Sequence, residues 1–182
     1  MASTRTRALD AAQTVVAENG IRALTHARVD ERAGLPKGST SNWFRTRTAL
    51  IAGLVAFVAE GERADAASLS PPRMQTPEDL TDLFCRFVEI ETGPEASRTR
   101  ARLALSLEAA HDAELLAPLI RQRAIFTDWT AGLLRDVGAR HPDEAARTLL
   151  ASGNGLVFHR LTVEPDAEIR PVIERAVRAC MD

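Results

Sequence analysis

The sequence predicts an all-α protein of about nine helices, and three observations lead to this fold class. Apolar residues recur at helical spacing along almost the whole chain. Glycine and proline interrupt this pattern at intervals that suit helix ends. No segment of convincing length alternates between apolar and polar residues as a half-buried strand does, and the sequence contains no repeat or low-complexity tract.

Three short helices are expected at the start of the chain. A stripe of apolar residues predicts a first helix over about residues 4–19, which a glycine ends. Thr25 is a typical N-cap for a second helix that runs to Ala33 and is also followed by a glycine. Pro36 suits the first turn of a third helix that continues to about Phe44, because a missing N–H is tolerated there.

Longer helices are expected behind these three. The fourth begins at about Thr46 and ends before a proline-rich loop at residues 70–77. Pro77 and the acidic residues after it have the chemistry of a helix start, which places the fifth helix there. The remaining helices are expected over about residues 95–112, 113–137, 143–161 and 167–181.

Composition places the chain among globular proteins. Its 182 residues are 45% hydrophobic, which is enough to bury a core. Cys85 and Cys180 show no metal-ligand spacing, so we expect no metal and a reducing compartment. No apolar run approaches the ~20 residues that span a bilayer, and the amino terminus lacks the apolar core of a signal peptide. We therefore expect a cytoplasmic protein without a membrane partner.

Charge is distributed unevenly along the chain. The net charge is −2, but residues 1–50 hold eight basic and four acidic side chains, a net of +4, so residues 51–182 carry −6. A basic front and an acidic remainder indicate a polyanionic partner for the front alone.

The stretch RVDERAGLPKGSTSNWF, residues 28–44, has the plan of a helix-turn-helix, which places its second helix in the major groove of DNA. Such a helix is short and presents hydrogen-bonding groups to the solvent. Ser39, Thr40 and Asn42 are candidates for reading base edges, and Ser41 can bind phosphate. Lys37 at the helix entrance can reach a phosphate or a guanine, and Gly38 allows close approach of the backbone.

The segment LTHARVDERAGLPKGSTSNWFRTRTALI resembles the DNA-binding segment of TetR-type (TetR/AcrR) bacterial transcriptional regulators. The match is close over residues 24–51, and with the spacing of the first helix it extends over residues 5–51. Members often have a tyrosine where this chain has Ser41 and an aliphatic residue where it has Thr40. The carboxy-terminal region varies across the family, so the resemblance does not identify a ligand.

The resemblance implies a domain organisation and a function. Residues 1–48 would form a helix-turn-helix DNA-binding domain, and residues 49–182 a helical domain for ligand binding and dimerisation. The chain would act as a repressor that binds a palindromic double-stranded DNA operator as a homodimer and is released by a small apolar effector. The DNA contacts expected are Thr25, His26, Arg28, Lys37, Gly38, Ser39, Thr40, Ser41, Asn42, Trp43 and Arg47.

Several of these assignments have structural alternatives. Lys37 and Arg47 are expected at phosphates, although either could be a solvated surface charge. Trp43 could donate its indole N–H to a phosphate or could belong to the core, where Phe44 is expected. Arg5 and Arg7 form either a DNA-contacting arm or a frayed terminus.

The carboxy-terminal region offers two candidate sites. Five large aromatic side chains either line an effector cavity or fill the core: Phe57, Phe84, Phe87, Phe126 and Trp129. The last two long helices are expected to form the dimer, because small residues there permit close helix approach. The expected interface residues are Ala151, Gly153, Gly155, Leu156 and Val157.

Residues for enzyme chemistry are not evident in the sequence. The four histidines lack metal-ligand spacing, and neither a glycine-rich phosphate loop nor a recognised nucleophile is present. Glu108 and His111 lie one helical turn apart, as a surface pair does. We therefore expect no catalysis and no cofactor. The alternatives are an all-α enzyme or ligand carrier that does not bind DNA, and a regulator that responds to a protein partner.

Overall fold

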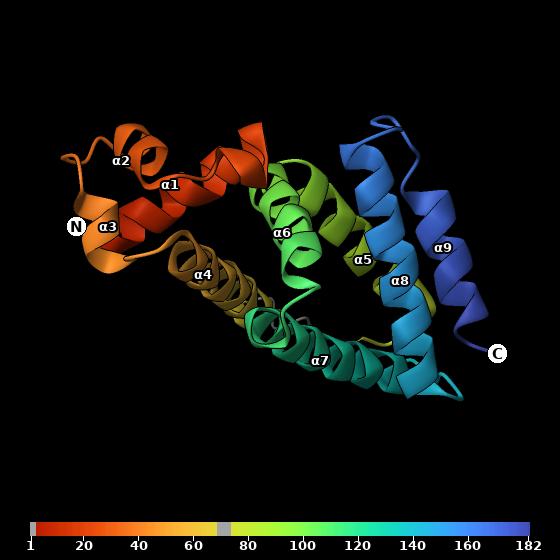
Figure 1. Cartoon of the computed structure of the whole chain (residues 1–182). Coiled ribbons are helices and arrows are strands. Elements are labelled where there is room, and N and C mark those ends of the chain that lie inside the picture. The colour runs from red at the N-terminus through yellow and green to blue at the C-terminus, as the bar shows by residue number, and fades with distance from the viewer. Residues whose placement is uncertain (1–2, 69–73) are drawn as a thin grey trace. The chain divides into compact units, whose positions relative to one another are not determined.

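The computed structural model describes residues 3–68 and 74–182, which form nine α-helices, one short 3-10 helix and no strand (Figure 1). The all-α prediction is confirmed. The helices are α1 (Thr4–Asn19), α2 (His26–Ala33), α3 (Ser39–Trp43), α4 (Arg47–Ser68), α5 (Pro77–Thr92), α6 (Ala96–Ala109), α7 (Ala113–Asp136), α8 (Pro142–Leu161) and α9 (Arg170–Ala179). None of the helices in the described ranges is long and apolar enough to cross a membrane.

The chain divides into two compact units. The first comprises residues 1–65 and 97–122, and the second comprises residues 66–96 and 123–182. Helices α4 and α7 therefore each contribute residues to both units. The domain boundary predicted after residue 48 falls inside the first unit and stays a prediction.

The first unit is built around one apolar core. Helix α1 contacts α2, α3 and the 3-10 helix Ile21–Ala23, and α2 contacts α3. Phe44, just after α3, packs in this core together with residues of α4 and α6. A Cβ atom at Gly53 of α4 would overlap the Phe44 ring, so glycine is required for this close approach. The fully buried members include Leu9, Leu24, Val29, Leu50, Leu54 and Leu105.

The second unit has its own core between α5, the second part of α7, α8 and α9. A capping box begins α5: Asp79 N donates to Thr76 Oγ1 at 3.1 Å, and Thr76 N donates to Asp79 Oδ2 at 2.9 Å. Arg170 of α9 forms ion pairs with Glu78 and Asp82 of α5, which join the two helices at the surface.

Three helix boundaries differ from the prediction: the start of α3, the start of α9, and the end of α6 at Ala109, three residues earlier than expected. Helix α3 begins at Ser39, so Pro36 lies in the turn and not in the first helical turn. The reason is that Gly38 adopts φ 92°, which breaks a helical path before residue 39. Helix α9 begins at Arg170, three residues later than expected. The loop predicted at residues 70–77 lies in part outside the described residues.

Candidate nucleic-acid interface

Helices α2 and α3 and the turn between them form a helix-turn-helix. Thr25 caps α2, because its Oγ1 accepts a hydrogen bond from Arg28 N at 3.3 Å. Gly34 ends α2 in the left-handed conformation with φ 59°. The predicted cap and stop of this helix are therefore confirmed.

Asp30 of α2 holds the start of α3 in place. Its Oδ1 accepts hydrogen bonds from Thr40 N at 2.8 Å and from Thr40 Oγ1 at 2.6 Å, and its Oδ2 accepts one from Gly38 N at 2.8 Å. Gly38, the N-cap of α3, has no side chain that could satisfy these backbone groups. A carboxylate one helix away serves as the cap instead.

The electrostatics of Asp30 follow from this arrangement. The residue is only 4% exposed, and this burial acts to raise the pKa of its carboxyl group. The hydrogen bonds from Thr40 and Gly38 stabilise the ionised form and outweigh burial, so the pKa of Asp30 is lowered overall. Folding therefore favours a charged carboxylate at this position.

The position of Thr40 corrects one prediction. Its side chain is fully buried, and its hydroxyl donates to Asp30. A buried hydroxyl with this partner cannot also reach a base edge, so the assignment of Thr40 to base readout is wrong. Thr40 instead fastens α3 to α2.

Ser39 and Ser41 use their hydroxyl hydrogens within the turn. Ser39 Oγ donates to the Pro36 carbonyl at 2.6 Å, and Ser41 Oγ donates to the Gly38 carbonyl at 2.8 Å. In this state both oxygens can still accept hydrogen bonds. Ser41 and Asn42 are exposed on α3, whereas Ser39 is half-buried.

Trp43 and Phe44 take opposite roles. Trp43 is 55% exposed at the end of α3, and Phe44 is buried in the core, so the core alternative for Trp43 does not apply. His26, which is half-buried, lies with Nε2 at 2.6 Å from the Phe44 carbonyl oxygen. His26 therefore ties the start of α2 to the end of α3.

Basic side chains surround α3. Lys37 is exposed in the turn, Arg28 is exposed on α2, and Arg45 is exposed directly after α3. Arg47, the first residue of α4, donates from Nη2 to the Ile21 carbonyl at 2.9 Å, and its Nη1 lies 3.6 Å from Glu108 Oε1.

Arg5 and Arg7 belong to the body of the fold. Both lie in α1, so neither is part of a frayed terminus or a free arm. Arg7 Nη2 donates to the Ala33 carbonyl at 2.8 Å and so caps the end of α2. The Arg5 guanidinium carbon lies 5.7 Å from the centre of the Phe44 ring, which is a cation–π distance.

Sequence reasoning missed Asp30, Arg45 and the role of Arg7. A signal for Asp30 was present: Gly38 leaves the start of α3 without a side-chain cap, so an acceptor must come from elsewhere. The sequence alone does not show which of the nearby acidic residues supplies it.

The predicted aromatic cluster divides between the two units. Phe84, Phe87, Phe126 and Trp129 contact one another in the second unit, where Phe126 and Trp129 stack with ring centres 5.2 Å apart and planes at 23°. Phe84 is buried and the other three are half-buried. Phe57 packs against the core of the first unit.

The predicted interface residues lie on two faces of α8. Gly153, Leu156 and Val157 are buried within the chain, whereas Ala151 and Gly155 are exposed.

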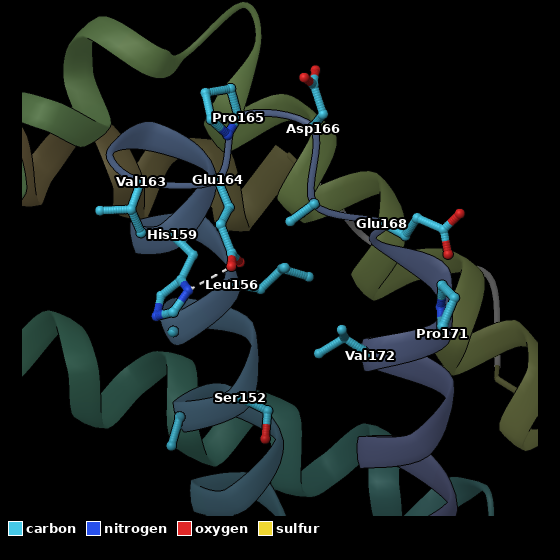
Figure 2. A pocket seen from close by; sticks show the side chains of 13 residues that line it. Ser152, Leu156, His159, Val163, Glu164, Pro165, Asp166, Glu168, Pro171 and Val172 are labelled. Atoms are coloured by element: carbon cyan, nitrogen blue, oxygen red, sulfur yellow. Dashed lines mark hydrogen bonds and ion pairs between the residues drawn. The ribbon is translucent and has the colours of Figure 1, made fainter.

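A groove runs between α8, the loop at residues 163–168 and the start of α9. In Figure 2, Leu156 and Val172 point into it from the two helices, and His159 Nδ1 lies 3.3 Å from Glu164 Oε2 at one end. Val163 and Val172, which line this groove, are exposed apolar residues, and Phe158 is a further exposed apolar residue of α8.

The fold and the α2–α3 motif define an all-helical protein of the helix-turn-helix class. Residues 75–182 match the tetracyclin repressor-like C-terminal domain. The chain belongs to the TetR family of transcriptional regulators. No curated protein matches the chain in sequence.

Solved structures share the fold over nearly the whole chain. A TetR-family member from Streptomyces coelicolor is 25% identical, with 98% of this chain and 99% of that one covered and a TM-score of 0.76. A transcriptional regulator from Rhodococcus sp. Rha1 is 18% identical, with 98% and 94% covered and a TM-score of 0.80. The multidrug binding protein EbrR, solved with ethidium, is 23% identical, with 99% of each chain covered and a TM-score of 0.74.

Replacing Asp30 with alanine is expected to lower the free energy of unfolding by about 2 to 4 kcal/mol, because the buried N–H and O–H groups of Thr40 and the partly buried N–H group of Gly38 lose their acceptor. Asp30→Asn tests the charge. Folding lowers the pKa of Asp30. The ionised carboxylate therefore makes its full contribution to the free energy of unfolding above the pKa of the unfolded chain, about 3.9, and loses it as the pH falls through the pKa of the folded protein. The stability advantage of the wild type over Asp30→Asn should therefore shrink in acid.

Urea denaturation at about pH 7 and about pH 3 measures this difference. Asp10→Asn is the control, because burial raises the pKa of Asp10 and the sign is reversed: the wild type should gain on that variant as the pH falls. An advantage over Asp30→Asn that stays constant with pH would show that the carboxylate does not act as a charged cap.

Proposed function

We propose that this chain is a ligand-responsive repressor that binds a palindromic operator as a homodimer and leaves it when a small apolar effector binds. One observation carries the DNA-binding part: α3 presents an exposed polar face on a helix that Asp30 fixes at its start. A regulator of this kind works beside the chromosome, in the cytoplasm.

The exposed groups divide by chemistry. Asn42 can pair with an adenine edge, and the half-buried Ser39 can accept a hydrogen bond there. Ser41 and the indole of Trp43, both exposed on α3, can bind phosphate or sugar. Lys37, Arg28 and Arg47 supply cations for phosphates, and the capped start of α2 at Thr25 presents backbone N–H groups.

Lys37→Ala and Arg47→Ala should each weaken binding to every DNA sequence. Each loss of a phosphate contact should reduce the slope of log affinity against log salt by about one unit per protomer. Fluorescence anisotropy with a duplex of about 30 base pairs, long enough for two half-sites one turn apart, measures the slope. Lys37 is the only lysine in the chain. If bound DNA protects the amine of Lys37 from chemical acetylation, the contact is located directly.

Arg135→Ala is the matched control, because Arg135 is an exposed arginine of α7 in the second unit. Its slope should equal that of the wild type. If neither Lys37→Ala nor Arg47→Ala changes the slope, both are surface charges. If the wild type itself does not bind DNA at low salt, the chain is better described as a ligand carrier.

We propose that α8 and α9 form the twofold interface. One recognition helix covers too little DNA for useful specificity, and two half-sites require two copies of the motif. Ala151 and Gly155 allow close helix approach, and Phe158 supplies exposed apolar area on the same face. The groove beside them would be covered by the second copy.

Gly155→Leu should convert the dimer to a monomer in sedimentation velocity experiments. A Cβ atom at Gly155 meets no atom of the same chain within 4 Å, so the fold of each protomer should survive, as circular dichroism can verify. Gly132→Leu is the control, because Gly132 is a helical glycine of α7 with equally open surroundings and should remain dimeric. Undiminished association of Gly155→Leu would exclude this interface.

We propose that the effector binds beside Phe87, Phe126 and Trp129. Their half-buried rings offer flat apolar surface, and the related fold of EbrR was solved with the planar aromatic ethidium. Helices α4 and α7 have residues in both units, and α4 begins beside α3, so a change in their tilt could alter the spacing of two recognition helices. That spacing must match one DNA turn of roughly 34 Å, and an effector shifts it only by binding one state better.

Titration of Trp43→Phe, in which Trp129 is the only tryptophan, should give saturable fluorescence changes with ethidium or the neutral aromatic phenanthrene. Phe126→Leu should weaken binding roughly tenfold because it removes the ring stacked on Trp129, whereas Phe158→Leu on α8 should not. Phenanthrene, which is uncharged, should also release the DNA duplex. Saturation without any change in DNA affinity would show that the two sites are not coupled.

A further inference from the structure

Arg47 joins three parts of the first unit. It is the first residue of α4, its Nη2 donates to the carbonyl of Ile21, and its Nη1 faces the carboxylate of Glu108 at 3.6 Å. Glu108 lies one residue before the end of α6. This ion pair therefore connects the start of α4 to the end of α6, and the hydrogen bond to Ile21 connects the same side chain to the 3-10 helix that precedes α2.

The hydrogen-bonding capacity of Arg47 allows a change of partner. A guanidinium group carries five N–H donors in a fixed plane, so the bond from Nη2 to Ile21 can hold the group in place while Nη1 exchanges its acceptor. The side chains of Arg47 and Glu108 are 45% and 37% exposed, so solvent and ligands can reach the pair.

We propose that Glu108 competes with DNA phosphate for Arg47, so that the free protein holds one of its phosphate-binding cations in an intramolecular ion pair. This inference rests on the proposed DNA-binding function and assigns Glu108 a role in regulating the affinity for DNA. Binding DNA exchanges the Glu108 carboxylate for a phosphate at Nη1 and leaves that carboxylate to the solvent.

The structure supports a competition that lowers the affinity for DNA but does not prevent DNA binding. Ala101 and Leu105 of α6 are fully buried in the same core as Leu50 and Leu54 of α4, so the two helices are fixed relative to each other near the pair. Exposed ion pairs are weak, and phosphate at a helix-turn-helix surface is an adequate competitor. Within the described ranges Lys37 makes no ion pair, so the competition applies to Arg47 and not to Lys37.

Glu108→Gln isolates the effect. It keeps the size of the side chain and removes the charge that holds Arg47, so affinity for an arbitrary duplex of about 30 base pairs should rise roughly two- to fivefold per protomer at low salt. The gain should disappear at high salt, because both the competing pair and the phosphate contact are then screened. Thermal denaturation of the variant confirms that the fold is retained.

Two comparisons separate competition from general charge repulsion. Glu114→Gln makes the same change of net charge at an exposed position of α7 in the same unit and should leave affinity nearly unchanged. In an Arg47→Ala background, Glu108→Gln should also have almost no effect, because there is no guanidinium left to release.

The outcomes distinguish this inference from the proposed function. A wild type that binds DNA while Glu108→Gln binds equally well overturns the competition alone. An equal gain with and without Arg47 overturns it too, because the carboxylate then acts by repulsion. Failure of the wild type to bind any duplex overturns the proposed function itself.

Discussion

The carboxylate of Asp30 is the interaction on which the candidate DNA-binding surface depends. A five-residue helix such as α3 is far too short to be stable by itself, because helix nucleation fixes several residues before the first hydrogen bond is formed. Three hydrogen bonds from Gly38 and Thr40 to one ionised, nearly buried carboxylate overcome this cost at the start of α3. At its end, the buried Phe44 ring against Gly53 and the His26 contact to the Phe44 carbonyl fix the helix again.

This way of fixing α3 divides its polar residues into two groups. Thr40 and His26 are used by the fold, and Ser39 and Ser41 give their hydroxyl hydrogens to the turn. Asn42 and Trp43 are left exposed on a helix whose position is already determined. Folding already restricts the conformation of α3, so DNA binding does not have to meet the entropic cost of ordering this helix again. Polar residues in a recognition helix are therefore not equivalent candidates for base contacts, and burial distinguishes them.

Local sequence signals predicted most of the fold. Helices α2 and α5 were located by Thr25 and by Pro77, because capping and the absent N–H of proline act within one turn of the chain. The start of α3 was missed because the φ of Gly38, which the sequence does not specify, decides between a helical and a turn path. Thr40 was misassigned and Asp30 overlooked because their bond joins residues ten positions apart, beyond what helical periodicity reports. Helical periodicity also could not show that Phe57 packs in a different core from the other four aromatic residues of the predicted cluster.

Helix α8 carries the physical argument for the proposed homodimer. A helix at the surface of a monomer needs one apolar stripe, and the inward stripe of α8 is supplied by Leu149, Gly153 and Leu156. A second, outward stripe of Ala151, Gly155 and Phe158 repeats at the same helical spacing but meets solvent. Gly155 on this outward stripe weakens the interior of the helix, and its neighbours in the chain leave its Cβ position open, so the packing of a single protomer gives no reason for it. Small residues on an exposed stripe offset this loss of helix stability when a second helix packs closely against them. We therefore propose that a second copy of the chain covers this face.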